Sequence, residues 1–263
     1  MDLFYILTGA SVGFVIGLTG VGGGSLMTPL LVLGFGINPA VAVGTDLLYA
    51  AITKAGGVFF HQKQGTVDWK ITGSLALGSI PASLLTIYFL EYLKQSDINY
   101  EKPMMVTLSV MLVLTSVVVF MRNRLLSFLH RSLTEKESLP SKLVVYRGCI
   151  TVCSGILLGI VVSLTSVGAG AIGSAILFLL YPGKPAISIV GTDLAHAVFL
   201  TAVAGLGHLH LGTVDLRLLG GLLIGGLPSI YLGSLIGKNI PDKFLRSLIA
   251  TILLGLGVTM LYK

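Results

Sequence analysis

The chain has 263 residues, of which 54% are hydrophobic and only 11% are charged, and its mean hydropathy is +0.94. A soluble domain usually carries about 25% charged residues, so these proportions exclude a water-soluble protein and predict an integral membrane protein embedded in the lipid bilayer. The formal net charge of +6 is explained by orientation in the membrane, and nucleic acid is not an expected partner.

Ten long, nearly uncharged runs follow one another along the chain. A spanning helix needs about 20 residues; six or more runs qualify, and two short ones suit half or re-entrant helices. The runs lack the alternation typical of a β-barrel, so we expect an all-α polytopic membrane protein with about 8–10 membrane segments. The runs are Leu3–Leu18, Leu26–Ile37, Ala40–Phe60, Ile71–Leu90, Pro103–Met121, Gly148–Leu164, Ala171–Tyr181, Ala186–Gly207, Leu218–Gly237 and Leu248–Tyr262.

A glycine-rich sequence, LTGVGGGS at 18–25, follows the first run. Each glycine costs about 1 kcal/mol relative to alanine inside a helix, so we expect the helix to break here. Irregular backbone is tolerated at membrane depth only where it is buried in protein or lines a cavity. A helix that begins after the break would offer free N–H groups and the positive end of its dipole to a small anion. Alternatively, the glycines serve only close helix packing.

Three motifs occur twice, in the same order and at an offset of 146 or 147 residues. This duplication predicts two homologous transmembrane repeats, residues 1–121 and 148–263, joined by a basic linker at 122–147. Each repeat would contain a helix, a glycine break, a short helix and three longer helices. The motif pairs are LTGVGGGS (18–25) with LTSVGAGA (164–171), VGTDL (43–47) with VGTDL (190–194), and HQKQGTVD (61–68) with HLHLGTVD (208–215).

The arrangement of helices predicts that the repeats are inverted. The break and the short helix form a hairpin that starts and ends on one side, so the other three spans give each repeat an odd number of crossings. Inverted repeats of this kind are common in secondary transporters. The positive-inside rule agrees, because twelve Lys and Arg residues fall on the linker side and four on the other, with Lys54 set aside inside a helix. We therefore expect a multi-pass protein of the cell membrane, with a cytoplasmic linker and both termini outside.

Candidate binding residues lie in the two breaks and in the repeated GTD sequence. The breaks would supply backbone amides, and the threonines would supply hydroxyl groups beside them. The candidate substrate-binding residues are Gly22, Gly23, Gly24, Ser25, Gly168, Ala169, Gly170, Thr45 and Thr192.

Asp46 and Asp193 fall well inside apolar runs. A charged carboxylate costs about 2.5–3.5 kcal/mol at the centre of a spanning helix, so each has a function. Each aspartate either caps or gates the adjacent broken hairpin, or carries a proton that couples transport. We therefore class both as coupling or gating candidates.

Lys54 and His196 are the other titratable residues inside apolar runs. The equivalent positions in the other repeat hold Thr201 and Tyr49, respectively. Lys54 either attracts an anion or extends to the nearby cytoplasmic interface. The sequence contains no metal-ligand set of convincing spacing and no nucleotide-binding motif. We therefore expect neither a metal nor a cofactor.

The sequences GVGGG, VGTD and G-x-V-D, with their second copies, resemble the sulfite exporter TauE/SafE family over essentially the whole chain. The resemblance implies a secondary transporter, not an enzyme, that moves anions such as sulfite, thiosulfate or organosulfonates by alternating access. It also leaves open coupling to protons or to another ion. The second break, SVGAGAIG, departs from the full triple glycine.

Several alternatives remain at this point. An anion channel, or a transporter of another small organic anion, would use similar residues. A membrane-embedded enzyme or assembly factor would need clustered His and carboxylate groups, which the sequence does not supply. Abundant glycine on the spans is compatible with contacts between protomers and hence with a homo-oligomer.

Overall fold

The computed structural model describes residues 3–19, 24–134, 141–237 and 240–262. Within these ranges all regular structure is helical, as the sequence predicts, and each of the ten apolar runs corresponds to one helix. The helices are α1 (Leu3–Thr19), α2 (Gly24–Phe35), α3 (Pro39–Lys63), α4 (Trp69–Gln95), α5 (Glu101–Thr134), α6 (Ser141–Thr165), α7 (Ala171–Leu180), α8 (Ala186–His210), α9 (Leu216–Gly237) and α10 (Asp242–Leu261).

Six helices of the described chain are long and apolar enough to cross a membrane: α4, α8, α9, and the apolar parts of α5, α6 and α10. The protein is therefore a multi-pass membrane protein. By contrast, α2 and α7 have only 12 and 10 residues, fewer than the roughly 17 that a spanning helix needs. These two are the short helices that the sequence predicts after the glycine breaks.

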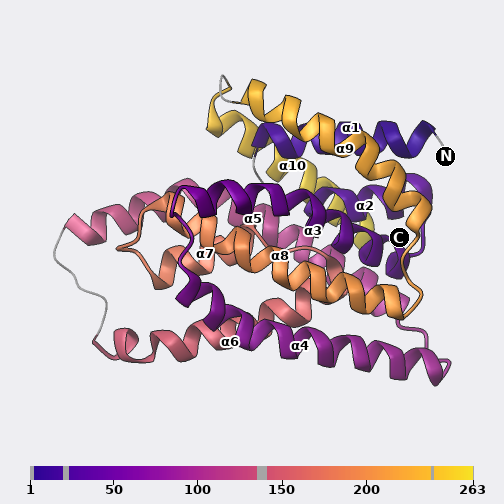
Figure 1. Ribbon diagram of the computed structural model, residues 1–263, viewed down its shortest axis with the longest axis horizontal. Helices are drawn as coiled ribbons and strands as arrows, with labels where there is room; N and C mark the ends of the chain where they lie inside the picture. The colour runs from indigo at the N-terminus through magenta and orange to yellow at the C-terminus, as the bar shows by residue number, and fades with distance from the viewer. Residues whose placement is uncertain (1–2, 20–23, 135–140, 238–239, 263) are drawn as a thin grey trace.

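The helices pack in pairs that join the N-terminal part of the chain to the C-terminal part. α3 and α8 lie together at the centre, α1 runs along α9 on one side, and α6 runs along α4 on the opposite side (Figure 1). α5 packs against α10. The two halves of the sequence are therefore interleaved rather than separate bodies.

Glycines bring the paired helices into close contact. A Cβ atom at Gly13 of α1 would lie 2.6 Å from the carbonyl oxygen of Gly226 in α9. A Cβ atom at Gly78 of α4 would lie 2.1 Å from the carbonyl oxygen of Val152 in α6. Only glycine fits at such distances, which is how small residues allow helix backbones to approach in a membrane.

The two central helices begin where the sequence predicts, at Asn-Pro and Lys-Pro. α3 starts at Pro39 and α8 directly after Pro185. The Asn38 side chain caps α3 by accepting a hydrogen bond of 2.9 Å from a first-turn amide. Asp46 and Asp193 consequently lie about two turns into their helices.

The predicted linker, residues 122–147, is helical over much of its length. α5 continues to Thr134 and α6 begins at Ser141, so both helices extend beyond their apolar spans of 101–121 and 146–165. The described part of the linker is therefore a continuation of two spanning helices.

Candidate functional site

The second glycine break separates α6 from α7 at residues 166–170. Gly168 and Gly170 have φ values of 109° and 120°, which other residues rarely adopt. These glycines let the chain reverse between two helices without a longer loop. Val167 and Ala169 are 0% and 7% exposed, so the break is buried in protein, as irregular backbone in a membrane must be unless it lines a cavity.

The start of α7 lies at a pocket. The amides of Ile172 and Gly173 both donate to the carbonyl of Gly168 at 3.2 Å. Those of Gly170 and Ala171 have no hydrogen-bond acceptor within the described part of the chain, and both residues line the pocket. This arrangement is compatible with an anion site at the second break, which stays a prediction.

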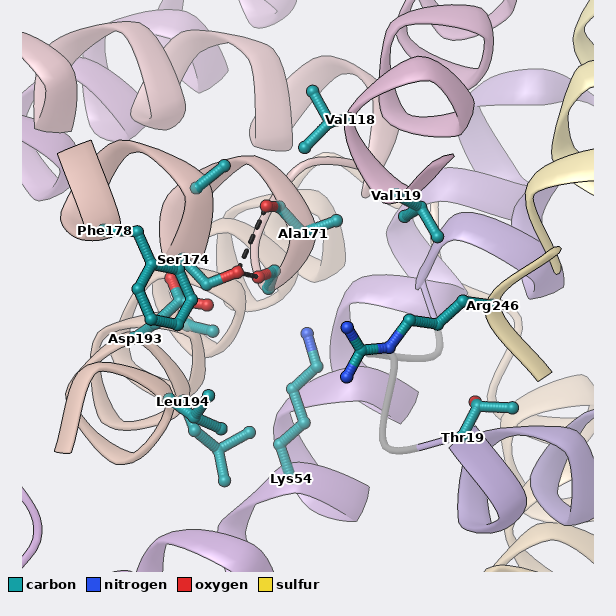
Figure 2. Close-up of a pocket in the computed structure, with 14 residues that line it drawn as sticks. Thr19, Lys54, Val118, Val119, Ala171, Ser174, Phe178, Asp193, Leu194 and Arg246 are labelled. Carbon is teal, nitrogen blue, oxygen red and sulfur yellow. Dashed lines mark hydrogen bonds between the residues drawn. The ribbon is translucent and has the colours of Figure 1, made fainter. Parts of the chain in front are cut away.

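The pocket contains about 740 Å³ of empty space, including the part open to its surroundings. Lys54 of α3 and Arg246 of α10 extend into it from different walls, toward one another and toward the start of α7 (Figure 2). One carboxylate, Asp193, also lines it, so the described lining carries a net positive charge. The other lining residues are Thr19, Val118, Val119, Gly170, Ala171, Ser174, Ala175, Phe178, Val190, Leu194 and Ala197.

Lys54 points into the protein rather than to the membrane surface. It is only 7% exposed, and its ammonium group donates a hydrogen bond of 3.2 Å to the carbonyl oxygen of Ala169. A side chain of the first half thus contacts the break of the second half. Lys54 also interacts electrostatically with Asp193 and, less strongly, with Asp46.

Asp46 joins α3 to the short helix α2. It is fully buried, and its Oδ2 accepts a hydrogen bond of 2.5 Å from the hydroxyl of Thr28. Ser166 of the second break faces the same carboxyl group. Among the described residues, Asp46 Oδ1 and Ser166 Oγ have no partner in hydrogen-bond geometry. Asp46 therefore lies between the short helix of its own half and the break of the other.

Asp193 and His196 complete this centre from α8. A Cβ atom at Gly173 of α7 would lie 2.1 Å from Asp193 Oδ1, so Asp193 packs directly on the short helix of its own half. His196 is fully buried, its Nε2 forms a hydrogen bond of 2.8 Å with Ser79, and it interacts electrostatically with Lys54. The four residues predicted to couple or gate transport thus lie around one centre.

The structure places Thr45 and Thr192 away from the pocket. The amide of Asp215 donates to Thr45 Oγ1 at 3.1 Å, and the amide of Asp68 donates to Thr192 Oγ1 at 2.9 Å. Each threonine belongs to one half of the chain, and the loop that it holds belongs to the other. Neither lines the pocket, so their role in substrate binding stays a prediction, while their contact with the loops is established.

The repeated VGTD and GTVD sequences pack on each other across the two halves. A Cβ atom at Gly44 would lie 2.2 Å from the carbonyl oxygen of Thr213, and one at Gly191 would lie 2.7 Å from His61 Nδ1. His61 and His208 each form a hydrogen bond of 2.8 Å with a threonine of their own loop. Among the described residues no group of three potential metal ligands occurs. The sequence reveals both motifs, but not that they contact each other.

The first break lies mostly outside the described residues. Gly22 and Gly23 fall within 20–23, which the structure does not describe. Gly24 is the first residue of α2, and Ser25 is 4% exposed. An anion site at the first break stays a prediction.

The sequence reasoning missed Arg246, Thr28 and Ser174. Arg246 precedes the apolar run that begins at Leu248 and was counted only as a flanking cation. Thr28 and Ser174 occupy equivalent positions of the two short helices, at the offset of 146 residues found for the break motif. A hydroxyl group present in both copies was the signal that could have identified them.

Comparisons with known proteins point to one family. A profile of the family described as "Sulfite exporter TauE/SafE" matches residues 5–260. "Probable membrane transporter protein YjnA" of Bacillus subtilis (strain 168) is 37% identical over 263 residues, 99% of this chain and 100% of the relative. "Probable membrane transporter protein YdhB" of the same organism is 27% identical over 237 residues, 87% of each chain. No solved structure matches.

Proposed function

The chain belongs to the sulfite exporter TauE/SafE family of membrane transporters, and from this membership together with the pocket we propose its substrate and mechanism. It is a secondary transporter that carries small sulfur-containing anions, of the sulfite, thiosulfate or organosulfonate type, across the cytoplasmic membrane. The prediction that it is not an enzyme is confirmed, because the family consists of transporters.

The observation that carries the proposal is the start of α7 beside two cations. The amides of Gly170 and Ala171 lack acceptors in the described chain and line the same pocket as Lys54 and Arg246. A helix N-terminus carries about half a positive charge, and Arg offers a planar fork of donors that suits an oxyanion. This combination favours a small oxyanion in contact with α7.

The remainder of the lining supports an organic substituent on that anion. Phe178, Val190 and Leu194 are among the apolar residues of the pocket. An organosulfonate would place its charged oxygens at the cations and its carbon atoms against these side chains. A small organic anion without sulfur is the alternative that the same geometry favours.

We infer that the two halves, α1–α5 and α6–α10, are inverted repeats. Their contacts are reciprocal: α1 packs along α9 and α6 along α4, while α3 packs on α8 and α5 on α10. The loop contacts are reciprocal as well, since Asp215 donates to Thr45 and Asp68 to Thr192. An odd number of crossings in each repeat would place both termini outside and the linker in the cytoplasm.

The difference between equivalent positions supports alternating access. Ser174 and Asp193 line the pocket and are 8% and 3% exposed, whereas the equivalent residues Thr28 and Asp46 are fully buried and joined by a hydrogen bond. A transporter that is open on one side and closed on the other would show this difference between its repeats. In the predicted orientation the open side is cytoplasmic, because Arg246 lies near the cytoplasmic end of α10.

Transport by purified protein in liposomes tests the proposal. We expect saturable uptake of at least one of sulfite, thiosulfate, sulfate and sulfoacetate. Arg246→Gln should raise the KM for that anion about tenfold or more, because a hydrogen bond to a charged group contributes about 1.5–3 kcal/mol. Arg217→Gln, which changes an exposed arginine of α9, is the matched control and should leave the KM unchanged.

Two results would contradict this proposal. An unchanged KM in Arg246→Gln would remove the pocket from the substrate path. Current that rises linearly with voltage and does not saturate with anion concentration would identify a channel instead of a carrier.

A further inference from the structure

The carboxyl group of Asp46 has surroundings that anion binding does not explain. It is fully buried, and only Oδ2 has a hydrogen-bond partner, the hydroxyl of Thr28 at 2.5 Å. The Ser166 side chain faces the carboxyl group, but among the described atoms Oδ1 has no partner in hydrogen-bond geometry. A buried carboxylate oxygen without a donor is costly when the group is ionised, and much less so when it is neutral.

Two carboxylates, Asp46 and Asp193, and two cations lie around this centre. Among the described residues, the charged and titratable groups here are Lys54 and Tyr49 on α3, Asp193 and His196 on α8, and Arg246 on α10. Lys54 interacts more strongly with Asp193 than with Asp46, and Arg246 lines the pocket together with Asp193. With both carboxylates ionised, these described charges sum to zero before an anion enters, and any further net charge is costly in buried surroundings.

An entering singly charged anion adds one negative charge that these groups do not balance. Lys54 and Arg246 both extend into the pocket that would hold the anion (Figure 2). Of the two carboxylates, Asp46 is the one that does not line this pocket and that interacts less with Lys54, so the unbalanced negative charge falls on Asp46.

We propose that Asp46 is a proton-binding carboxyl group and that one proton moves with each singly charged anion. This inference rests on the proposed function and names the coupling ion. The proton resides on the Asp46 carboxyl group while the pocket holds the anion beside α7. It leaves when the Thr28–Asp46 contact opens on the other side of the membrane. Because binding free energies are reciprocal, a bound proton favours anion binding and a bound anion favours proton binding.

Proteoliposomes separate this coupling from transport itself. In the first assay, labelled methanesulfonate or isethionate, organosulfonates with a single negative charge, exchanges for unlabelled anion at equal pH, which requires no net movement of protons. In the second, a proton gradient of about 1 pH unit drives net uptake, and for a singly charged anion it sustains up to about tenfold accumulation. Sulfite is avoided, because its neutral acid form crosses lipid unaided.

Asp46→Asn should retain exchange and lose proton-driven accumulation, because an amide resembles the neutral carboxyl group but cannot release a proton. Asp215→Asn is the matched control, since this aspartate caps α9 at the end of a loop and asparagine caps a helix equally well. The control should keep both activities. Proton-driven accumulation that persists in Asp46→Asn would overturn the proposal.

A second measurement needs no variant. The wild-type protein in weakly buffered detergent solution should take up protons from a pH indicator when methanesulfonate or isethionate is added. Anion binding without proton uptake would overturn the proposal. Accumulation driven by a sodium gradient at constant pH, and lost in Asp46→Asn, would assign the site to sodium and also overturn it. No exchange of either anion by the wild-type protein would count against the proposed function itself.

Discussion

Lys54 and Arg246 are the cations of the pocket, and neither has a basic counterpart in the other half. The position equivalent to Lys54 holds Thr201, and α5 contains no Lys or Arg between Lys102 and Met121. The cations that line the described pocket therefore stand at positions where the duplication supplies no second basic residue. An anion bound at the start of α7 meets more positive charge than it would at an equivalent place near α2, so its affinity should differ between the two sides of the membrane.

Asp68 lies outside the spanning helices, and the structure shows which groups donate hydrogen bonds to its carboxylate. It caps α4 by accepting hydrogen bonds from the amides of Lys70 and Ile71, and Lys184 donates to its Oδ2 at 2.7 Å. The hydrogen bond from Lys184 is the main cause that holds the pKa of Asp68 below its usual value. The interaction of Asp68 with Lys184 therefore stabilises the folded protein at pH values above the ordinary carboxyl pKa. This stabilisation is lost as the pH falls through the lowered pKa of Asp68.

Asp68→Asn should lower the thermal stability near neutral pH and have less effect in acid. Asparagine keeps the helix cap but removes the charge that pairs with Lys184. Fluorescence-detected size-exclusion chromatography after heating, repeated over a range of pH, measures the difference. Asp215→Asn is a matched control, because no cation partner of Asp215 is found among the described residues. Equal loss of stability at every pH would show that the ion pair contributes nothing.

The types of residue within the apolar runs were enough to predict part of the candidate site. Asp46, Lys54, Asp193 and His196 stand out in the sequence because ionisable groups are rare in apolar runs, and the structure brings them together. Arg246 was not predictable as a pocket residue, because a cation at the end of a span is usually explained by orientation. The direction in which the Arg246 side chain points depends on the rotation of α10 about its own axis, which the sequence does not determine.

At the scale of helices, close packing depends on glycines that face a neighbouring backbone. Gly78 of α4 and Gly73 of the same helix differ in this respect, since a Cβ atom at Gly78 would meet the carbonyl oxygen of Val152 at 2.1 Å and one at Gly73 would meet nothing within 4 Å. Replacing each of these two glycines by alanine therefore separates the effect of helix propensity from the effect of helix packing.

Gly78→Ala should destabilise the protein by about 1–3 kcal/mol, because the added methyl group forces α4 and α6 apart. Gly73→Ala should be neutral or stabilising by up to about 1 kcal/mol, since alanine is the better helix former. Thermal or denaturant unfolding in detergent compares the two variants. A Gly78→Ala protein as stable as Gly73→Ala would mean that the two helices are not in contact at this point.

The helices themselves were largely predictable, whereas their partners were not. Apolar runs, the Asn38–Pro39 start and the break before α7 indicate where helices begin and end. A helix in lipid is apolar on every side, so its sequence does not show which face meets protein. The extension of α5 to Thr134 was also not predicted, because its last turns are charged and fall outside the apolar pattern.

At the scale of the whole molecule, alternating access predicts that two equivalent hydroxyl positions differ in accessibility. Ser174 lines the pocket, and Thr28 is fully buried. In a background without Cys149 and Cys153, which are both exposed, Ser174→Cys should react with a membrane-impermeant thiol reagent from the side of the pocket. Thr28→Cys should react much more slowly.

Transported anion should then change this pattern. Turnover exposes the closed side for part of the time, so the labelling of Thr28→Cys, from the membrane side opposite the pocket, should become faster when anion is added. Mass spectrometry of the labelled protein measures both rates. Equal reactivity of the two cysteines from the same side, with or without anion, would contradict alternating access.

The pairing of α1 with α9 also determines when the protein can be completed in the cell. α1 leaves the ribosome before α9, so its glycine face meets its partner only after residue 216 and the rest of α9 have been synthesised. Until then the nascent chain must keep that face against lipid or against the insertion machinery. The docking of α1 on its partner is therefore delayed until the synthesis of α9 is complete.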